Sequence, residues 1–328
     1  MTELKARALW LEPPGHAGVR EELLLQQDPE ELLVRTCYSA ISRGTETLVY
    51  GGGVPASEYE RMRAPFQVGT LPGPVKYGYA NVGVVEAGPA HWLGRCVFCL
   101  YPHQTRYWIH PDAVVVLPEA VPAARAVLAA NMETAVNALW DAAPRMGDRI
   151  SVVGAGVLGC LVARLCSQIP GVQVELIDIR QDRAQIARAL QVGFAAPEHA
   201  AAGRDLVFHA SASAAGLNTA VALAGREAEI IELSWYGTRS VTVDLGGRFH
   251  SQRLSLRASQ VGTVSPARVA RWSHHDRLAL AVSLCADVRL DSLFAPDISF
   301  ASLPEAIARL ADPADSTLCQ RVHYTEES

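Results

Sequence analysis

The sequence Arg149-Ile-Ser-Val-Val-Gly-Ala-Gly-Val-Leu-Gly159 decides the fold of this chain of 328 residues. Its first five residues form an apolar run of the kind that becomes a buried strand. Three glycines spaced Gly-x-Gly-x-x-Gly follow directly, and residues 157–168 continue with helical periodicity until Pro170-Gly171. The stretch therefore predicts a strand, a tight turn and a helix that packs closely against the strand.

Each glycine of this turn has its own physical role. The first permits the tight turn, the second lets the backbone approach a pyrophosphate, and the third lets the helix approach the strand. The N-terminus of the helix offers free N–H groups and the positive end of the helix dipole to phosphate. We therefore predict a dinucleotide site formed by Gly154, Gly156, Val157, Leu158 and Gly159.

A second strand-like run, residues 174–178, ends in Asp178, 19 residues after Gly159. An acidic side chain here accepts hydrogen bonds from ribose hydroxyls and repels a 2′-phosphate, which favours NAD over NADP. Arg180 lies two residues further on and offers a partner to a 2′-phosphate. An aspartate at a strand end also suits a helix cap or a turn, and this alternative stays open.

Short apolar runs alternate with helix-period segments between residues 136 and 262. After the two strands above, the runs at 206–208 and 230–233 continue the pattern, and the segment 183–190 has helical spacing. Strands that alternate with helices predict an α/β domain with a doubly wound parallel sheet, the Rossmann fold. Ser211 and Ser234 follow the later two strands and complete the cofactor-binding candidates on this sheet.

The regions on either side of this domain differ from it. Residues 1 to about 125 form short β-like runs broken by turn formers. After residue 262 we expect helices at 276–285 and 303–310 and a β-like close at 318–324, a tail too short to be independent. We therefore predict one mostly β domain from residues 1–134 and 263–328, with a Rossmann domain, 135–262, inserted in it.

Composition and charge exclude several classes of partner. The chain carries 29 Lys and Arg against 34 Asp and Glu residues, a net charge of −5, so we expect no nucleic acid as partner. The charge-free apolar stretch at 150–163 is shorter than the roughly 20 residues of a membrane-spanning helix, so we expect no membrane partner. The N-terminal residues lack the apolar segment of a secretory signal, which predicts a cytoplasmic protein.

Seven cysteines are an odd number, spread over a chain large enough to have its own core. We therefore expect reduced thiols rather than a disulfide framework. Cys96 and Cys99 lie in a strand-like apolar run, in which residues three apart point to opposite faces. They predict two buried thiols and not a metal site.

Four segments together resemble the medium-chain dehydrogenase/reductase superfamily, whose first domain is GroES-like. They are residues 38–46, 76–86, 154–159 and 249–262. Within it the chain is similar to zinc-lacking branches: Ser-x-Gly-Thr-Glu at 42–46 resembles bacteriochlorophyllide a dehydrogenase, and metal-free chemistry resembles the quinone oxidoreductases. The resemblance implies hydride transfer between nicotinamide C4 and a carbonyl, alcohol or activated alkene.

The same resemblance implies further contacts. A helix that begins near Glu133 borders the nicotinamide in the superfamily, which adds Thr134 and Asn137 to the cofactor-binding candidates. Superfamily members commonly pair through edge strands of the nucleotide-binding sheet, so a homodimer through residues 229–245 is expected. The proton-relay hydroxyl of the superfamily falls on Gly44 here, so a conventional alcohol dehydrogenase relay is in doubt.

The positions of the catalytic zinc ligands are also changed. By the resemblance, a cysteine is replaced by Ser42, the histidine of Gly-His-Glu by Tyr79, and the third ligand falls on Glu133. Catalytic zinc needs three nitrogen, sulfur or carboxylate ligands, and neither a serine nor a tyrosine hydroxyl is a usual substitute. We therefore predict that no zinc is bound.

Without zinc, side chains must stabilise the developing oxyanion and move the proton. Tyr79 and Ser42 are our donor candidates, and Glu46 and Glu133 are our acid/base candidates. Each has a structural alternative: Tyr79 as a packed aromatic ring, Glu46 in an exposed ion pair with Arg43, and Glu133 in the favoured first turn of a helix. We expect His103 and His250 to have structural roles.

Two functions fit these residues. The first is an NAD(H)-dependent, zinc-independent oxidoreductase acting on a small molecule, and the long loop at 50–66 suits a quinone-like or ring-bearing substrate. The second is a non-catalytic dinucleotide-binding sensor or structural protein, which the loss of the metal ligands also favours. The sequence leaves the substrate and the direction of transfer open.

Overall fold

The computed structural model describes residues 4–325, so residues 1–3 and 326–328 of the predicted β domain lie outside the described part. The chain divides into two compact units. The first comprises residues up to 130, residues 278–288 and residues from 294 onward, and the second comprises residues 131–277 and 289–293.

The second unit is larger than the domain 135–262 that the sequence predicted. It extends through Arg277, because the guanidinium group of this buried residue binds the Glu133 carboxylate and the carbonyl oxygens of Val261 and Thr263. These bonds attach the segment after residue 262 to the inserted unit rather than to the β unit. The Ser265 N–H also donates to Asn137 Oδ1, so several buried polar contacts join this segment to the inserted unit.

The first unit contains two sheets that are mostly antiparallel. The four-stranded sheet has the order β2 (His16–Leu23), β1 (Lys5–Glu12), β5 (Val75–Lys76) and β4 (Val68–Gly69). The larger sheet has the order β16 (Ile298–Ser299), β17 (Gln320–His323), β3 (Leu32–Ile41), β6 (Asn81–Ala87), β7 (Cys96–Cys99) and β9 (Val114–Val116), while β8 (Arg106–Ile109) also pairs with β3.

The C-terminal tail joins this larger sheet. Strand β17 runs antiparallel to β3, with Val322 opposite Ser39. The helices of the first unit are α1 (Arg43–Tyr50), α2 (Ala123–Ala126) and α8 (Leu303–Leu310). Helix α8 buries the apolar face formed by Leu303, Ala306, Ile307 and Leu310. Since apolar residues three and four apart share a helix face, the sequence located this helix correctly.

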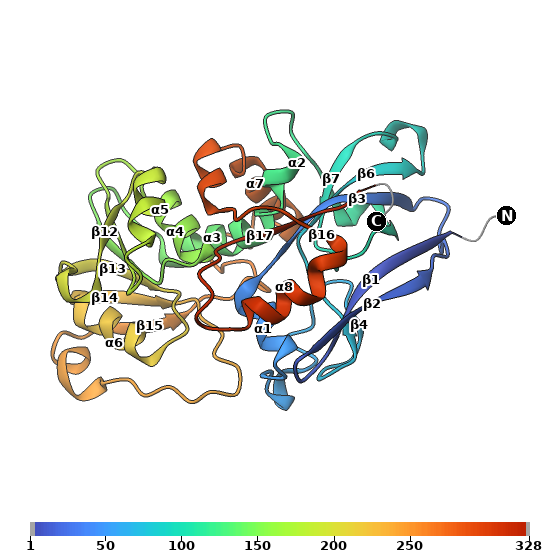
Figure 1. Ribbon diagram of the computed structural model, residues 1–328. Helices are drawn as coiled ribbons and strands as arrows, with labels where there is room; N and C mark the ends of the chain where they lie inside the picture. Colours follow the sequence, from blue (N-terminus) through green and yellow to red (C-terminus); the bar gives the residue numbers. More distant parts are fainter. Residues whose placement is uncertain (1–3, 326–328) are drawn as a thin grey trace. The chain divides into compact units, whose positions relative to one another are not determined.

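The second unit is a six-stranded parallel sheet (Figure 1). Its order is β12 (Gly193–Ala195), β11 (Gln173–Ile177), β10 (Arg149–Val153), β13 (Arg204–His209), β14 (Ala224–Glu232) and β15 (Ser255–Ala258). Helices α4 (Val157–Cys166) and α5 (Arg183–Ala189) lie on one side and α6 (Ala214–Leu223) on the other. This is the strand order of a Rossmann fold.

The central strands β10 and β13 are largely buried on both faces because helices cover both. Ile150, Val152, Leu176, Val207 and Ile230 are all fully buried. Helix α3 (Ala129–Ala142) begins at the boundary of the two units, and α7 (His274–Leu284) crosses the other boundary.

The predicted dimer edge, residues 229–245, is wrong in detail. It contains the end of β14, which is an inner strand bonded to β13 and β15. The edge strand is β15, because the chain returns after residue 245 and adds one more parallel strand. All four residues of β15 are exposed.

Two further observations concern membranes and thiols. Over residues 4–325 no helix is long and apolar enough to cross a bilayer. All seven cysteines are free thiols. Cys99 is buried as predicted, but Cys96 is only partly buried, because it begins strand β7 rather than lying within it.

Candidate functional site

The glycine turn between β10 and α4 has the predicted geometry. Gly154 has φ +108°, a left-handed conformation that favours glycine, and a Cβ there would lie 2.7 Å from the backbone nitrogen of Ser211. A Cβ on Gly159 would overlap the carbonyl oxygen of Gly154. Both positions therefore require glycine for close packing of backbone on backbone.

Gly156 differs from its two neighbours in the motif. It is exposed, and a Cβ there would meet no atom within 4 Å. Gly156 is the N-cap of α4, so the N–H groups of Val157 and Leu158 in the first turn have no carbonyl partner within the helix. These features fit a pyrophosphate: the backbone is bare, the N–H groups are free, and the space beside them is open.

Asp178 follows β11 next to this turn. Its Oδ2 accepts a hydrogen bond of 2.7 Å from the Ala155 N–H, and its Oδ1 accepts one of 2.9 Å from the Arg180 N–H. The Asp178 side chain therefore stabilises a turn, which was the alternative to a role in cofactor binding. The same bonds also hold its carboxylate beside the glycine turn. The Arg180 guanidinium lies 3.4 Å from Asp182.

Ser211 and Ser234 lie beyond the carboxyl ends of β13 and β14, in a polar cluster with residues that the sequence analysis did not select. The His209 ring lies between Ser211 Oγ and Glu232 Oε2, at 2.7 Å from each. Ser234 Oγ accepts a 3.0 Å hydrogen bond from the Ala212 N–H. The signal for this cluster was a histidine directly after the predicted strand 206–208 and a glutamate within the predicted strand 230–233.

The Glu232 carboxylate accepts several hydrogen bonds. The Ser234 N–H donates to Oε1 at 2.7 Å, and the Tyr236 hydroxyl donates to Oε2 at 3.0 Å. Burial acts to raise the pKa of Glu232, but the hydrogen bonds from His209 and Ser234 outweigh it and hold that pKa below its ordinary value. Glu232 is therefore ionised at neutral pH.

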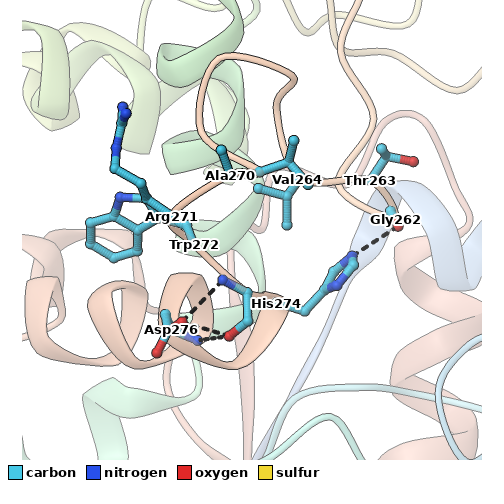
Figure 2. Close-up of a pocket in the computed structure, with 10 residues that line it drawn as sticks. Gly262, Thr263, Val264, Ala270, Arg271, Trp272, His274 and Asp276 are labelled. Atoms are coloured by element: carbon cyan, nitrogen blue, oxygen red, sulfur yellow. Dashed lines mark hydrogen bonds between the residues drawn. The ribbon is translucent and has the colours of Figure 1, made fainter.

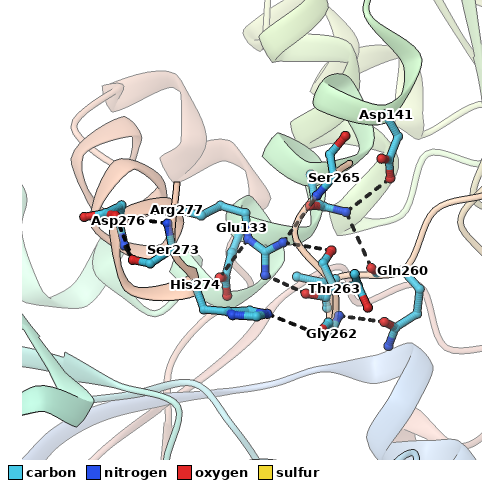
Figure 3. Close-up of polar contacts among 12 residues, drawn as sticks. Glu133, Asp141, Gln260, Gly262, Thr263, Ser265, Ser273, His274, Asp276 and Arg277 are labelled. Carbon is cyan, nitrogen blue, oxygen red and sulfur yellow. Dashed lines mark hydrogen bonds and ion pairs between the residues drawn. The ribbon is translucent and has the colours of Figure 1, made fainter. Parts of the chain in front are cut away.

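Glu133 and Asn137 bind a buried arginine (Figure 3). The Arg277 Nε donates to Glu133 Oε1 at 3.0 Å, and its Nη1 donates to Asn137 Oδ1 at 2.6 Å. Asn137 Oδ1 also accepts from the Ser265 N–H, and its Nδ2 donates to Asp141. Burial raises the pKa of Glu133 even though Arg277 acts to lower it.

These contacts correct two expectations. Glu133 is not in the first turn of its helix, because α3 begins at Ala129, and the carboxylate binds Arg277 instead of interacting with the helix end. Asn137 uses both ends of its amide within the protein, so its contact with a nicotinamide has no support here. Thr134 lies on the same helix and is partly exposed.

In the first unit, Ser42 and Tyr79 are brought together. The Tyr79 hydroxyl donates a 2.6 Å hydrogen bond to Ser42 Oγ. Burial of the phenol, with the nearby Glu46 charge, raises the pKa of Tyr79 to about 12. The phenol is therefore neutral at physiological pH and able to donate a proton in a hydrogen bond.

Glu46 is fully buried, so it does not form the exposed ion pair with Arg43 that the sequence offered as an alternative. It lies on α1, where the sequence suggested a turn, and its Oε1 accepts from the Ser42 N–H at 2.8 Å. Its Oε2 lies 2.9 Å from His103 Nε2. The Arg43 guanidinium instead donates to carbonyl oxygens at the end of α8, among them that of Leu310.

His103 extends this buried network. Its Nδ1 lies 2.7 Å from Ser39 Oγ, which in turn lies 2.9 Å from the Tyr324 hydroxyl. The ring packs on Gly78, which has φ +121°, so that a Cβ there would lie 2.7 Å from His103 Cδ2. His103 is thus more than a residue near a strand end, since it joins Glu46 to the C-terminal strand.

The zinc-ligand positions do not fit zinc. Ser42 and Tyr79 are neutral hydroxyls bonded to each other, and Glu133 is paired with Arg277. Within residues 4–325 no group of three or more His, Cys, Asp or Glu side chains is placed to hold a metal ion. This donor set gives a divalent cation no three strong ligands.

A hollow of about 640 Å³ lies on the segment 262–276 of the second unit (Figure 2). Its lining includes Val264, Trp272 and His274, and the His274 ring lies 3.1 Å from the Gly262 carbonyl oxygen. The hollow is open, and none of the predicted site residues lines it. We do not assign it to the candidate site.

Comparison with known proteins gives the fold but no sequence family. No protein-family model matches the chain, and no curated protein sequence matches it either. Solved structures do match over nearly the whole chain. L-Idonate 5-dehydrogenase from Escherichia coli K-12 has a TM-score of 0.79 at 14% identity, covering 98% of this chain and 99% of that one.

Two other solved structures contain a nicotinamide cofactor. A protein of Sinorhizobium meliloti 1021 assigned as a zinc-binding dehydrogenase, bound to NADP, has a TM-score of 0.76 at 16% identity, covering 98% and 100% of the two chains. An alcohol dehydrogenase from Escherichia coli CFT073, complexed with NADH, has a TM-score of 0.75 at 17% identity, covering 98% and 99%. The predicted fold, a GroES-like domain with a Rossmann domain, is confirmed.

Proposed function

We propose that this protein is a zinc-independent, NAD(H)-dependent oxidoreductase of the medium-chain type. The observation that carries the proposal is the open turn at Gly156, with bare backbone and free N–H groups next to the Asp178 carboxylate. A bound nicotinamide supplies or accepts hydride. The similar folds of NADP- and NADH-bound dehydrogenases support this function.

In this proposal the hydroxyl groups of Ser42 and Tyr79 stabilise the substrate oxygen, which is the role of a catalytic zinc ion. Tyr79 is a neutral donor with a pKa of about 12, and a substrate oxygen can replace Ser42 as its acceptor. Donation to a developing oxyanion stabilises the transition state. The buried Glu46 bonds the Ser42 backbone and holds this end of β3 in place.

A second candidate is a dinucleotide-binding protein without catalysis. Both carboxylates that the sequence offered as acid/base groups are engaged, Glu46 with His103 and Glu133 with Arg277. This observation favours the sensor, since neither group is free to take up a substrate proton. The two candidates differ in turnover and not in NADH binding.

The proposal is tested by titrating the protein with NADH and assaying it against quinones, enones, aldehydes and ketones. We expect Tyr79→Phe to lower kcat about 10- to 100-fold with an unchanged Kd for NADH, because only the oxyanion donor is lost. Tyr50→Phe is the matched control, since its hydroxyl donates to the Gly15 carbonyl oxygen outside the site. Tight NADH binding with no turnover in any assay would favour the sensor.

We propose that NAD is preferred because the Asp178 carboxylate repels a 2′-phosphate. Asp178→Asn keeps an oxygen acceptor for the Ala155 N–H and removes the charge. We expect the ratio of NADPH to NADH affinity to rise about tenfold, roughly 1.4 kcal/mol. Asp205→Asn, at an exposed ion pair with Arg149, is the control that should leave the ratio unchanged. Fluorescence titration with NADH and NADPH measures this ratio of affinities. An unchanged ratio in Asp178→Asn would contradict the proposal that Asp178 determines the preference for NAD.

We also propose a homodimer formed through the exposed edge strand β15. An exposed strand edge presents unpaired backbone groups to a second strand, and Leu256 on this edge is 38% exposed. We expect Leu256→Lys to shift the protein from dimer to monomer in sedimentation velocity. Leu93→Lys, an exposed leucine of the first unit, should not. A monomeric wild-type protein would refute the proposal.

A further inference from the structure

A chain of hydrogen bonds runs from a buried histidine to the surface of the second unit. His209 ends β13 and Glu232 ends β14, directly opposite in register, and the His209 side chain is fully buried. The His209 Nε2 lies 2.7 Å from Ser211 Oγ, which lies 3.0 Å from the oxygen of the exposed Ser213. The order is carboxylate, imidazole, hydroxyl, hydroxyl.

The proton positions in this chain follow from its acceptor. An ionised Glu232 accepts from His209 Nδ1–H, so a neutral imidazole presents Nε2 as an acceptor to the Ser211 hydroxyl. The other ionisable group that faces the ring is Tyr236, whose hydroxyl donates to Glu232 and whose ring stacks 6.4 Å from that of His209. From α6 the neighbour is Gly216, where a Cβ would lie 2.9 Å from Nε2.

The outer end of this chain lies against the dinucleotide turn. A Cβ on Gly154 would lie 2.7 Å from the Ser211 nitrogen and 2.8 Å from the Ala210 carbonyl carbon, so the two backbones are packed together. Both belong to the carboxyl edge of the parallel sheet, where ligands of this fold bind.

We propose that Ser211, His209 and Glu232 form a proton relay for the hydroxyl group of a substrate, beginning at Ser211 beside the dinucleotide turn. The proposal rests on the proposed function. In alcohol oxidation the substrate C–H bond would break, and a bound nicotinamide would supply the acceptor for the hydrogen and its electron pair. The O–H proton passes to Ser211 Oγ as the proton of Ser211 passes to His209 Nε2, and Glu232 stabilises the imidazolium. Reduction runs in reverse.

The relay is tested with Ser211→Ala and His209→Gln in the full-length protein, with the substrate of highest turnover in the assays above. We expect kcat to fall at least about 30-fold while the Kd for NADH stays within about twofold. We expect the pH profile of kcat for oxidation to differ between wild type and both variants, because both variants lack the relay. Thr219→Ala, whose hydroxyl bonds the Ala215 carbonyl oxygen on α6, is the control.

A second measurement does not depend on turnover. In protein labelled with ¹³C-histidine, the His209 signal is the one missing from His209→Gln, and its titration with pH reports protonation directly. We expect NADH to shift this titration in wild type and not in Ser211→Ala. If NADH binds without moving it, or if both variants keep wild-type kcat and pH profile, the relay is refuted while the proposed function stands. Failure to bind NADH refutes both.

Discussion

Gly156→Ala is expected to weaken NADH binding at least tenfold while the protein stays folded. A methyl group at this position meets no protein atom within 4 Å, so nothing in the chain must move to admit it. The same methyl group occupies the space through which the backbone must approach a pyrophosphate. Tenfold corresponds to about 1.4 kcal/mol of binding free energy.

Two matched variants separate binding from folding. Gly159→Ala places a methyl group on the Gly154 carbonyl oxygen, so we expect it to lower both NADH affinity and thermal stability. Gly18→Ala, on strand β2, also points into open space, so we expect neither quantity to change. For Gly156→Ala we expect Tm to fall by only about 2–4 °C, since replacing glycine by alanine, a poorer N-cap residue, costs on the order of 1 kcal/mol.

The measurements are NADH fluorescence titration and thermal unfolding followed by circular dichroism. Gly156→Ala with wild-type NADH affinity would show that the cofactor does not lie on this turn. That outcome would refute the proposed function, because the exposed turn at Gly156, at the N-terminus of α4, is the observation on which it rests.

Arg277→Met is expected to destabilise the second unit by about 3–5 kcal/mol, because it leaves the buried Glu133 carboxylate without a counter-charge. The Arg277 side chain is 1% exposed and that of Glu133 is 6% exposed. The substitution also removes the donors to Asn137 and to the carbonyl oxygens of Val261 and Thr263. Each buried acceptor left unpaired adds to the loss.

The control is Arg149→Met, which breaks an exposed ion pair with Asp205 in the same unit. Exposed pairs of this kind contribute about 0–1 kcal/mol, so its effect should be small. We expect the double variant Glu133→Gln with Arg277→Met to be more stable than Arg277→Met alone, since it removes the unpaired charge. Urea unfolding followed by circular dichroism measures all four proteins.

The loss in Arg277→Met should also depend on pH. Burial raises the pKa of Glu133 even with Arg277 present, and without the arginine only the nearby His274 still acts to lower that pKa. A carboxyl whose pKa is higher in the folded state binds its proton more tightly there, so stability increases as pH falls. We expect Arg277→Met to lose less stability at pH 5 than at pH 8. An equal loss at both values would show that the carboxylate is not the source of the effect.

The fold of the second unit followed from local sequence. The apolar runs at Arg149–Val153 and in β11 predicted strands, and the glycine spacing predicted a close-packed turn between strand and helix. The same local logic located α8, whose apolar residues share one face. Steric and hydrophobic constraints act over a few residues, so a short stretch of sequence is enough to specify them.

The site followed from sequence only in part. Ser42 and Tyr79 were selected together only because of the family resemblance, and in the structure their hydroxyl groups are hydrogen-bonded. His209 and Glu232 were not selected, although the first directly follows the predicted strand 206–208 and the second lies within the predicted strand 230–233. Which strands are neighbours decides whether two such side chains meet, and strand order is a property of the whole sheet.

The sequence by itself determined the glycine turn and the parallel sheet. Only the tertiary structure decided the partners of the buried charges: His103 lies 57 residues from Glu46, and Arg277 lies 144 residues from Glu133. It also decided that β15, and not β14, is the edge of the sheet. A buried charge needs an oppositely charged or hydrogen-bonding partner, and this partner can be far away in the sequence. Local sequence patterns therefore do not identify it.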